Sequence, residues 1–492
     1  MAQDLLYFLP QWILIGTIIV LFFCDFFIGI KKQGIYPLVA AAGIVGMMIA
    51  NGSIASLASK HLFSGMITFD AMGHFFHYLF GAAGLFGIFL SWKSPEVEKT
   101  DQTSYFTLLV ALVLGMMLLS TSNHLLMLYL SLEMVSVLSY ILTGYLRGVR
   151  RSTEASLKYV IYGGVASAIM VYGISLLYGL TGSLSFPEIA SFIKTHAVDR
   201  PVLFTSVLMM MAGLGFKVAA VPFHFWCPDV YEGAPTPFTA FLSVGPKAAG
   251  VAILLRFFFV GLSQKTPEGF VLVKTTGWVE MMTILSIATM TVGNLAALVQ
   301  TNMKRLLAYS SIAHAGYLLM GVAALNQEAL TATLFYLVVY LIMNMGAFLV
   351  VIIIANQLGT EEVNGYRGLG RRGGQGTLLA LSMAVFLFSL TGIPPMAGFI
   401  GKFYLFGAVI RSGLYGLAIV GVLNSVVSLY YYVRIVKLMF FDAPADHAPK
   451  ITTAPSLAHS WVVSGLALLT LTLGLFWDGL AGIVSRSAGL FF

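Results

Sequence analysis

Residues 204–250 read FTSVLMMMAGLGFKVAAVPFHFWCPDVYEGAPTPFTAFLSVGPKAAG. Lys217 lies in a run of Leu, Met, Val and Ala that is typical of a membrane span, and Pro222 interrupts that run. A polar, proline-rich segment follows, and an apolar helix then resumes and carries Lys247. A charged side chain at bilayer depth costs about 2.5–3.5 kcal/mol, so an apolar helix rarely carries one unless it lines a polar cavity. Two lysines around one break therefore indicate an ion path.

The composition of the whole chain indicates a polytopic membrane protein. Its 492 residues are 59% hydrophobic and 10% charged, with a mean hydropathy of +0.90, which soluble globular proteins do not approach. The net charge is +7, but the basic residues are spread over short loops without a patch, which argues against a nucleic-acid partner. Cys24 and Cys227 form no ligand cluster, so we expect neither an iron–sulfur site nor electron transfer through this chain.

Hydropathy predicts an all-α protein with about fourteen membrane helices, because each crossing needs roughly 20 apolar residues. The approximate centres of the predicted spans are Ile19, Ala42, Phe80, Leu112, Val135, Met170, Met210, Val251, Ala288, Gly316, Val339, Phe386, Val426 and Leu468. One set of alternate loops holds fifteen Lys and Arg residues and the opposite set holds seven. The positive-inside rule places the richer set in the cytoplasm. An even number of spans then puts both termini on the periplasmic side.

A second proline break resembles the first. In LTGIPPMAGFIGKFYLF, residues 390–406, Pro394 and Pro395 interrupt a span and Lys402 lies on the resumed half. Mid-span prolines free backbone carbonyls, which are tolerated where the backbone is buried in protein or lines water. A packing kink is the alternative for one such break. Two breaks, each with a lysine nearby, favour a functional role over a packing kink.

The breaks lie in the seventh and twelfth spans, which predicts an internal repeat. Spans four to eight, repeated as nine to thirteen, place both breaks on the fourth helix of a five-helix unit. Because five is odd, the two copies are expected to be inverted. The predicted divisions are residues 1–100 for helices one to three, 101–270 for repeat one, 271–442 for repeat two and 443–492 for helix fourteen.

The fifth span carries one acid, Glu133. An isolated buried carboxylate or lysine tends to lose its charge, whereas a pair holds both charged. We therefore expect Glu133 to pair with Lys217, so that a nearby charge change can open the pair and let Lys217 exchange a proton. The alternative is a static ion pair that joins two helices.

Three further residues are candidates for the same path. Lys158 follows Glu154 at helical i,i+4 spacing, which fits either an interfacial ion pair or an inward-facing proton carrier. His224, in the first break, can relay protons near neutral pH or serve as a hydrogen-bonded cavity histidine. His314 lies on the tenth span, the repeat counterpart of the span that carries Glu133.

The other ionisable residues give weaker evidence for a functional role. His74 and His77 lie three residues apart on the third span, but no partner cluster supports a haem or a metal, so core or interfacial histidines are favoured. Arg256 is expected to reach an interface with its long side chain. The chain has no phosphate-binding loop, which argues against direct ATP drive.

Five strings carry a family resemblance, which covers about the fourth to the thirteenth span. They are LYLSLEMVSVLSYILTGY (128–145), EASLKYVIYGGVASAIMVYGISLLYGLTGS (154–183), GFKVAAVPFHFWCPDVYEGAPTPFTAFLSVGPK (215–247), KRLLAYSSIAHAGY (304–317) and TGIPPMAGFIGKFYLF (391–406). These strings resemble the subunit N family of bacterial NADH:quinone oxidoreductase, complex I, whose members are antiporter-like subunits. The third string is the most specific.

The resemblance implies fourteen helices, two inverted five-helix repeats and one proton channel. Within it, Glu133 and Lys217 match a paired charge switch, Lys158 and Lys247 match residues of a central axis, and Lys402 matches the basic residue of the second broken helix, on the outlet side. His224 matches a histidine on the path.

The resemblance also implies a proton-pumping translocase in the bacterial inner membrane, in which this chain contacts the lipid bilayer and other membrane subunits. It implies that NADH, FMN, iron–sulfur clusters and quinone bind to other subunits and that this chain holds no cofactor and no metal. A subunit of a Mrp-type cation/proton antiporter or of a related membrane-bound hydrogenase complex is the alternative within the fold. A stand-alone transporter and a purely structural subunit are alternatives from other classes.

Overall fold

The structure is a computed structural model that describes residues 2–28, 34–266, 269–272, 277–444 and 457–489. The first part of the chain contains α1 (Ala2–Tyr7), α2 (Leu9–Ile28), α3 (Ile35–Ser53), the hairpin β1 (Lys60–Leu62) and β2 (Ile67–Phe69), α4 (Ala71–Ser91) and α5 (Pro95–Glu98). The two strands pair antiparallel, with His61 opposite Thr68.

The middle part carries the first proline break. It contains α6 (Gln102–Thr121), α7 (Leu125–Thr143), α8 (Arg150–Thr181), α9 (Phe186–Thr195), α10 (Arg200–Val218), α11 (Trp226–Gly233), α12 (Thr236–Arg256), the π-helical turn η2 (Phe257–Gly261) and the hairpin β3 (Ser263–Thr266) and β4 (Gly269–Leu272).

The last part carries the second break. It contains α13 (Trp278–Ala297), α14 (Met303–Ala324), α15 (Gln327–Leu358), the short 3-10 turns η3 (Val363–Tyr366) and η4 (Leu369–Arg371), α16 (Gly374–Thr391), α17 (Ala397–Arg411), α18 (Tyr415–Phe440), α19 (Leu457–Leu475) and α20 (Asp478–Ala488). Residues 457–488 thus form two helices, where the sequence predicted one span.

The membrane-helix prediction is confirmed. Within the described ranges, thirteen helices are long and apolar enough to cross a membrane, and α2 adds a shorter apolar stretch, Leu9–Cys24. Every predicted centre falls inside one of these helices. The division into two inverted repeats stays a prediction.

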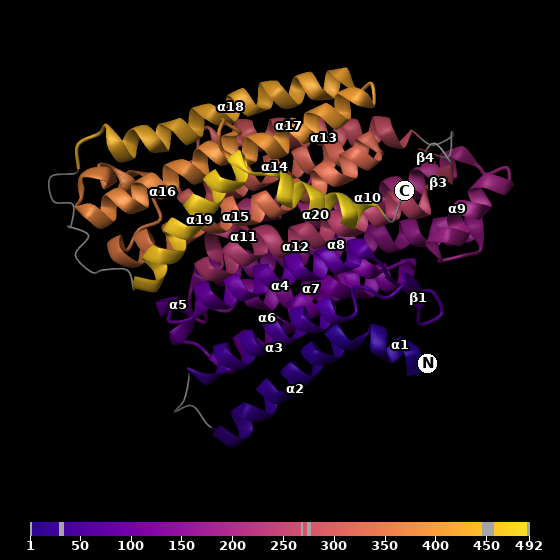
Figure 1. The fold of residues 1–492 in the computed structure, drawn as a ribbon, viewed down its shortest axis with the longest axis horizontal. Coiled ribbons are helices and arrows are strands. Elements are labelled where there is room, and N and C mark those ends of the chain that lie inside the picture. Colours follow the sequence, from indigo (N-terminus) through magenta and orange to yellow (C-terminus); the bar gives the residue numbers. More distant parts are fainter. Residues whose placement is uncertain (1, 29–33, 267–268, 273–276, 445–456, 490–492) are drawn as a thin grey trace.

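The helices run side by side between two ends of the molecule (Figure 1). One end, which we call the basic end, carries α5 and the loops 144–149, 298–302 and 359–373. The other, the hairpin end, carries β1–β2, β3–β4 and α9, and the N- and C-terminal parts of the chain also lie there (Figure 1).

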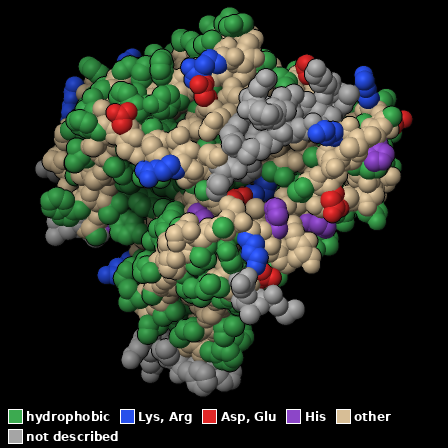
Figure 2. Space-filling view, turned by 45° about the vertical axis from the view of Figure 1, so that its right-hand side comes forward, with side chains coloured by type: hydrophobic (Ala, Val, Ile, Leu, Met, Phe, Trp, Pro, Cys, Tyr) green, Lys and Arg blue, Asp and Glu red, His purple; other side chains and the backbone are tan. Residues whose placement is uncertain are grey.

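Large hydrophobic side chains cover the flanks of the bundle. Exposed examples are Ile161 and Val165 on α8 and Leu423 and Val426 on α18. Figure 2 turns the hairpin end toward the viewer and shows charged and histidine side chains on this face, with hydrophobic side chains around it. Apolar flanks between polar ends are what a bilayer requires of a membrane protein.

Helix α12 forms the centre of the bundle. All of its residues are buried, because α4, α6, α10, α14 and α15 pack around it. The two cations on this helix, Lys247 and Arg256, are therefore enclosed by protein.

The expectation that Arg256 reaches an interface is wrong. Its side chain is 1% exposed, and its Nη1 and Nη2 donate to the two carboxylate oxygens of Asp70 at 2.7 and 3.0 Å. Its Nε donates to the Ser120 carbonyl at 2.8 Å. Since a carboxylate meets the guanidinium inside the protein, the side chain does not need to extend to water.

The chain leaves helical geometry at both proline sites. Between α10 and α11, Ala219 has a φ of 59°, and the indole of Trp226 donates to the Phe216 carbonyl at 3.0 Å. Between α16 and α17, Gly392 has a φ of 89°, and the Ser389 hydroxyl accepts the Gly398 N–H at 3.0 Å. Side chains thus satisfy backbone groups that the breaks leave free, as burial in a membrane requires.

Candidate functional site: buried lysines joined by serines and tyrosines

Lys217 occupies the last turn of α10 and is almost fully buried. Its ammonium donates to the Ser136 hydroxyl at 3.3 Å. Glu133, one helical turn before Ser136 on α7, instead accepts a hydrogen bond from Ser167 of α8. The predicted direct pair is therefore not formed: no ion pair links Glu133 and Lys217 in the part of the chain that the structure describes, because a serine is the hydrogen-bond partner of each.

Lys158 lies at the basic end between two acids. Its Nζ is 2.8 Å from Glu154 Oε1 and 2.7 Å from Asp229 Oδ2, and its side chain is 39% exposed. The interfacial pair with Glu154 is confirmed, and Asp229 of α11 is an additional partner. Arg305 Nη1 binds the other oxygen of Asp229 at 2.7 Å, so this carboxylate joins α8 to α14. A cavity of about 200 Å³ opens beside these side chains.

Lys247 is buried in the middle of α12. Its ammonium donates to the Ser311 hydroxyl on α14 and lies 5.7 Å from the centre of the Tyr231 ring, a distance at which the ring face attracts a cation. Ser311 also accepts a hydrogen bond from Tyr340 of α15 at 2.8 Å. Lys247 thus connects α12 to two helices of the second half of the chain.

His314 lies one turn beyond Ser311 on the same face of α14, because residues three apart are neighbours on a helix. Its Nδ1 is 2.5 Å from the Tyr336 hydroxyl, and its Nε2 is 3.5 Å from the Tyr432 hydroxyl. Its ring centre is also 5.2 Å from that of Tyr340. His314 is therefore surrounded by tyrosines from α15 and α18.

Lys402 lies at the second break. Its ammonium donates to the Thr391 carbonyl at 2.9 Å and to Ser425 of α18 at 3.2 Å. It is 4.3 Å from the centre of the Tyr317 ring, and Ser425 donates to the Tyr317 hydroxyl at 3.1 Å. Tyr317 follows His314 by three residues on α14.

The α14 residues Ser311, His314 and Tyr317 thus form one polar face that reaches from Lys247 to Lys402. We call this face, with the two lysines and Tyr340, the polar axis. It contains three of the predicted path residues, Lys247, His314 and Lys402. Hydroxyl and imidazole groups both donate and accept hydrogen bonds, so such a face can pass protons.

His224 is not joined to the polar axis. It is buried beside Phe225, and its Nδ1 has no hydrogen-bond partner among the described residues. Pro222 lies nearby in the non-helical segment, and Pro394 and Pro395 lie in the corresponding segment of the second break.

The sequence analysis missed the partners of the lysines. Ser311 and Tyr317 lie three residues before and after His314 in SSIAHAGY, so their position on the same helix face could have been predicted from the sequence. Tyr340, Ser425 and Asp229 lie far along the chain from the lysines that they approach, so only the fold brings them there.

Comparison with known proteins places the chain in a family. The family model described as NADH:quinone oxidoreductase/Mrp antiporter, TM, matches residues 122–428. A relative from Chloroherpeton thalassium, NADH-quinone oxidoreductase subunit N 2, is 44% identical over 98% of this chain and 94% of its own length. The chain belongs to the subunit N family of NADH-quinone oxidoreductases. The family-model match contains all seven predicted path residues, from Glu133 to Lys402.

Solved structures agree with this membership. A chain of respiratory complex I from Thermus thermophilus, solved with bound aureothin, is 30% identical to this chain, with a TM-score of 0.79. The match covers 97% of this chain and 99% of the Thermus chain. A chain of the Mrp complex from Dietzia has a TM-score of 0.84 with 97% of its length covered and 99% of this chain, but it is 20% identical and so shows the shared fold alone.

No group of three or more His, Cys, Asp or Glu side chains that could hold a metal occurs in the described ranges. The side chains of the polar axis are two lysines, one serine, two tyrosines and one histidine, which form hydrogen bonds through N–H and O–H groups.

Proposed function

We propose that this chain translocates protons across the bacterial inner membrane as an antiporter-like subunit of NADH-quinone oxidoreductase. The polar axis from Lys247 to Lys402 is the observation that carries the proposal. It lies inside a bundle of apolar membrane helices, where a buried lysine is costly and is retained chiefly for function.

The path has an uptake half, a centre and an outlet. Protons enter from the basic end, which faces the cytoplasm, near Lys158 and Lys217. They cross the centre at Lys247 and His314 and leave by the Lys402 region. His224 lies beside the uptake half. Both termini are then periplasmic, as the even number of crossings requires.

Glu133 acts as the charge switch of the uptake half. Its carboxylate now accepts from Ser167 while Lys217 donates to Ser136, and in this proposal the pair forms when these two bonds are exchanged. A change of charge beside Glu133 in a neighbouring membrane subunit then alters the proton affinity of Lys217.

The energy comes from other subunits. Moving one charge against 100 mV requires about 2.3 kcal/mol. In this proposal NADH, FMN, the iron–sulfur clusters and quinone are bound elsewhere in the complex, and electron transfer there drives proton movement here. The chain performs no redox chemistry and holds no cofactor. Its repeats, residues 101–270 and 271–442, supply the two halves of one channel.

The test is Lys217→Ala in the assembled complex. Removal of a positioned proton carrier slows proton transfer by about 10²–10⁴-fold, so we expect NADH-driven proton uptake into inverted vesicles to fall while the complex assembles normally. Lys194→Ala, which changes a lysine of α9 outside the path, is the matched control. Unchanged protons per NADH in normally assembled Lys217→Ala would refute the switch.

A stand-alone cation/proton antiporter gives a different result. The purified single chain in liposomes would exchange Na⁺ or another solute for protons without NADH. We expect no such exchange from the chain alone.

A further inference from the structure

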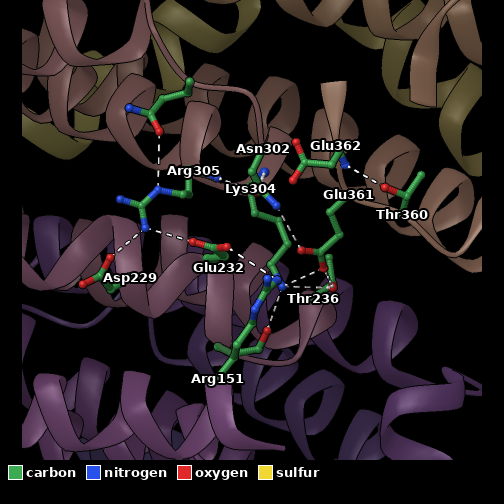
Figure 3. Close-up of polar contacts among 12 residues, drawn as sticks. Arg151, Asp229, Glu232, Thr236, Asn302, Lys304, Arg305, Thr360, Glu361 and Glu362 are labelled. Carbon is green, nitrogen blue, oxygen red and sulfur yellow. Dashed lines mark hydrogen bonds and ion pairs between the residues drawn. The ribbon is translucent and has the colours of Figure 1, made fainter. Parts of the chain in front are cut away.

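Two neighbouring openings lie beside the turn between α11 and α12 at the basic end, and they share Arg151, Glu232 and Gly233 in their linings. The first contains Lys158 and is part of the proposed path. The second is a cavity of about 500 Å³, whose lining includes Glu96, Thr236, Lys304, Ile352 and Glu361. Figure 3 shows Lys304 directed toward Thr236 and Glu361, while the adjacent Arg305 points the other way, toward Asp229 and Glu232. The second opening was not predicted from the sequence and is not part of the proposed path.

The second cavity is lined with charged side chains that contact one another and the beginning of α12. The Nζ of Lys304 is 3.0 Å from Glu361 Oε1, and it also donates to the Ala234 carbonyl at 2.9 Å. Glu96 accepts the backbone N–H of Thr236 at 2.7 Å. The carboxylate therefore binds the first turn of α12, where the helix dipole favours a negative charge. The beginning of α12 forms a wall of this cavity.

A polar stripe continues from the cavity along α12. Thr236, Thr239, Ser243 and Lys247 are spaced by three, four and four residues, which places them on one face of the helix. All four side chains are buried. These side chains thus lie on one face of α12 between the cavity and Lys247, the lysine at the start of the polar axis.

Asn344 of α15 provides the second observation. Its Nδ2 donates to the Ser243 hydroxyl at 2.6 Å, and the residue is fully buried. Its Oδ1 has no hydrogen-bond partner among the described residues. Buried polar atoms without a protein partner are usually satisfied by an ordered water. Asn344 also lies one turn from Tyr340, which shares Ser311 with Lys247.

We propose that the second cavity is a separate proton entrance and that Ser243, Asn344 and a water on Asn344 Oδ1 pass protons from it to Lys247. The inference rests on the proposed function. One proton moves from the water chain to the neutral amine of Lys247, which becomes an ammonium, and the cytoplasm returns one proton to the water chain. Lys247 is then protonated without a proton from Lys217.

Phe348 lies between the second cavity and Asn344 along α15. It lies on α15 one turn from Asn344 toward the cavity, is fully buried, and its ring centre is 6.3 Å from that of Tyr231. In this proposal the Phe348 ring moves aside when water passes from the cavity to Asn344.

The experiment measures NADH oxidation and proton uptake together in inverted vesicles that contain the full complex. Asn344→Leu removes the amide oxygen and nitrogen. We expect this variant to pump fewer protons per NADH, because the protons that enter by this route are lost. Asn344→Asp keeps an oxygen for the water and is expected to restore it. Asn51→Leu, another fully buried asparagine, is the matched control and is expected to pump normally.

The outcomes separate the two proposals. If Lys247→Ala lowers protons per NADH while Asn344→Leu and Ser243→Ala both leave it unchanged, the second entrance is refuted and the proposed function stands. If Lys247→Ala also pumps normally, the proposed function itself fails. A loss in Asn344→Leu that Asn344→Asp does not restore assigns Asn344 to packing and overturns its role as a carrier.

Discussion

Two kinds of buried cation occur in the described part of the chain. Arg256 and Lys304 each form an ion pair with a carboxylate, which fixes their charge. Lys217, Lys247 and Lys402 form no ion pair in the described ranges, and their partners include a serine each. A serine hydroxyl can accept from an ammonium or donate to an amine. Serine partners therefore suit a lysine that changes its protonation state.

The Asp70–Arg256 pair allows a stability prediction. Replacing Asp70 by Asn leaves a buried guanidinium without its counter-charge, and breaking such a pair costs about 3–5 kcal/mol. We expect a lower unfolding temperature for Asp70→Asn complex in detergent. The double variant Asp70→Asn, Arg256→Met removes the unpaired charge and should recover much of the loss. Equal stability of Asp70→Asn and the parent would contradict a stabilising role.

The same pair sets a pH dependence. Burial alone would raise the pKa of Asp70, but the charge of Arg256 and the hydrogen bonds from Arg256 and Gly73 outweigh burial and hold that pKa below its ordinary value of 3.8. Because the folded-state pKa is the lower one, the contribution to stability is present above about pH 4 and is lost as the pH falls through the folded pKa. The stability difference between parent and Asp70→Asn should thus be constant near neutral pH and shrink in acid.

Individual charged residues were predictable from the sequence, but their partners were not. A lysine in an apolar run is visible without a structure, as are Glu133 and the prolines. The serine partners of Glu133 and Lys217, and the carboxylate partner of Arg256, depend on how α4, α7, α8, α10 and α12 pack. The charged residues were thus predicted correctly, whereas the direct pair expected between Glu133 and Lys217 is not formed.

At the scale of elements, helices α13 and α14 pack closely through glycines. A Cβ atom on Gly316 would lie 2.5 Å from Met290 Cγ and 2.6 Å from its backbone nitrogen, and one on Gly293 would lie 2.6 Å from the Ala313 nitrogen. This contact holds the α14 face of the polar axis in place. Small residues permit such close helix packing in membranes.

Gly316→Val tests this contact. The added side chain meets backbone, which cannot yield without moving α13, and overpacking of this kind costs about 1–3 kcal/mol. We expect a lower unfolding temperature and reduced protons per NADH, because His314 and Tyr317 flank the site. Gly164→Val on α8, where a Cβ would have no atom within 4 Å, is the control and should behave as the parent.

Prolines predicted two interruptions, but the interruption between α19 and α20 has no proline. It lies beside the second break, because a Cβ on Gly474 would clash with the Pro395 carbonyl oxygen. This close approach of two distant segments is a tertiary feature that the local sequence does not show. The membrane helices themselves were predictable because hydropathy depends on composition alone.

For the whole molecule, the basic end and the hairpin end define its orientation in the membrane. We expect Lys99→Cys to react with a membrane-impermeant maleimide in inverted vesicles and Ser64→Cys to react only in right-side-out ones, since both positions are exposed and lie at opposite ends. Buried Cys227 should stay unlabelled, and a parent measurement corrects for Cys24. Reversed labelling would invert the proposed direction of transport.

The enclosure of α12 has a consequence for biosynthesis. A helix that carries Lys247 and Arg256 inserts into lipid unfavourably by itself, because each cation is costly in the bilayer. Chain order reduces this problem. Asp70, Ser120 and the whole of α4, α6 and α10 are synthesised before Arg256, so a counter-charge and a carbonyl are already in the membrane when it arrives. Asp70 and Ser120, which lie before the family-model match, thus precede in chain order the helix whose Arg256 they contact.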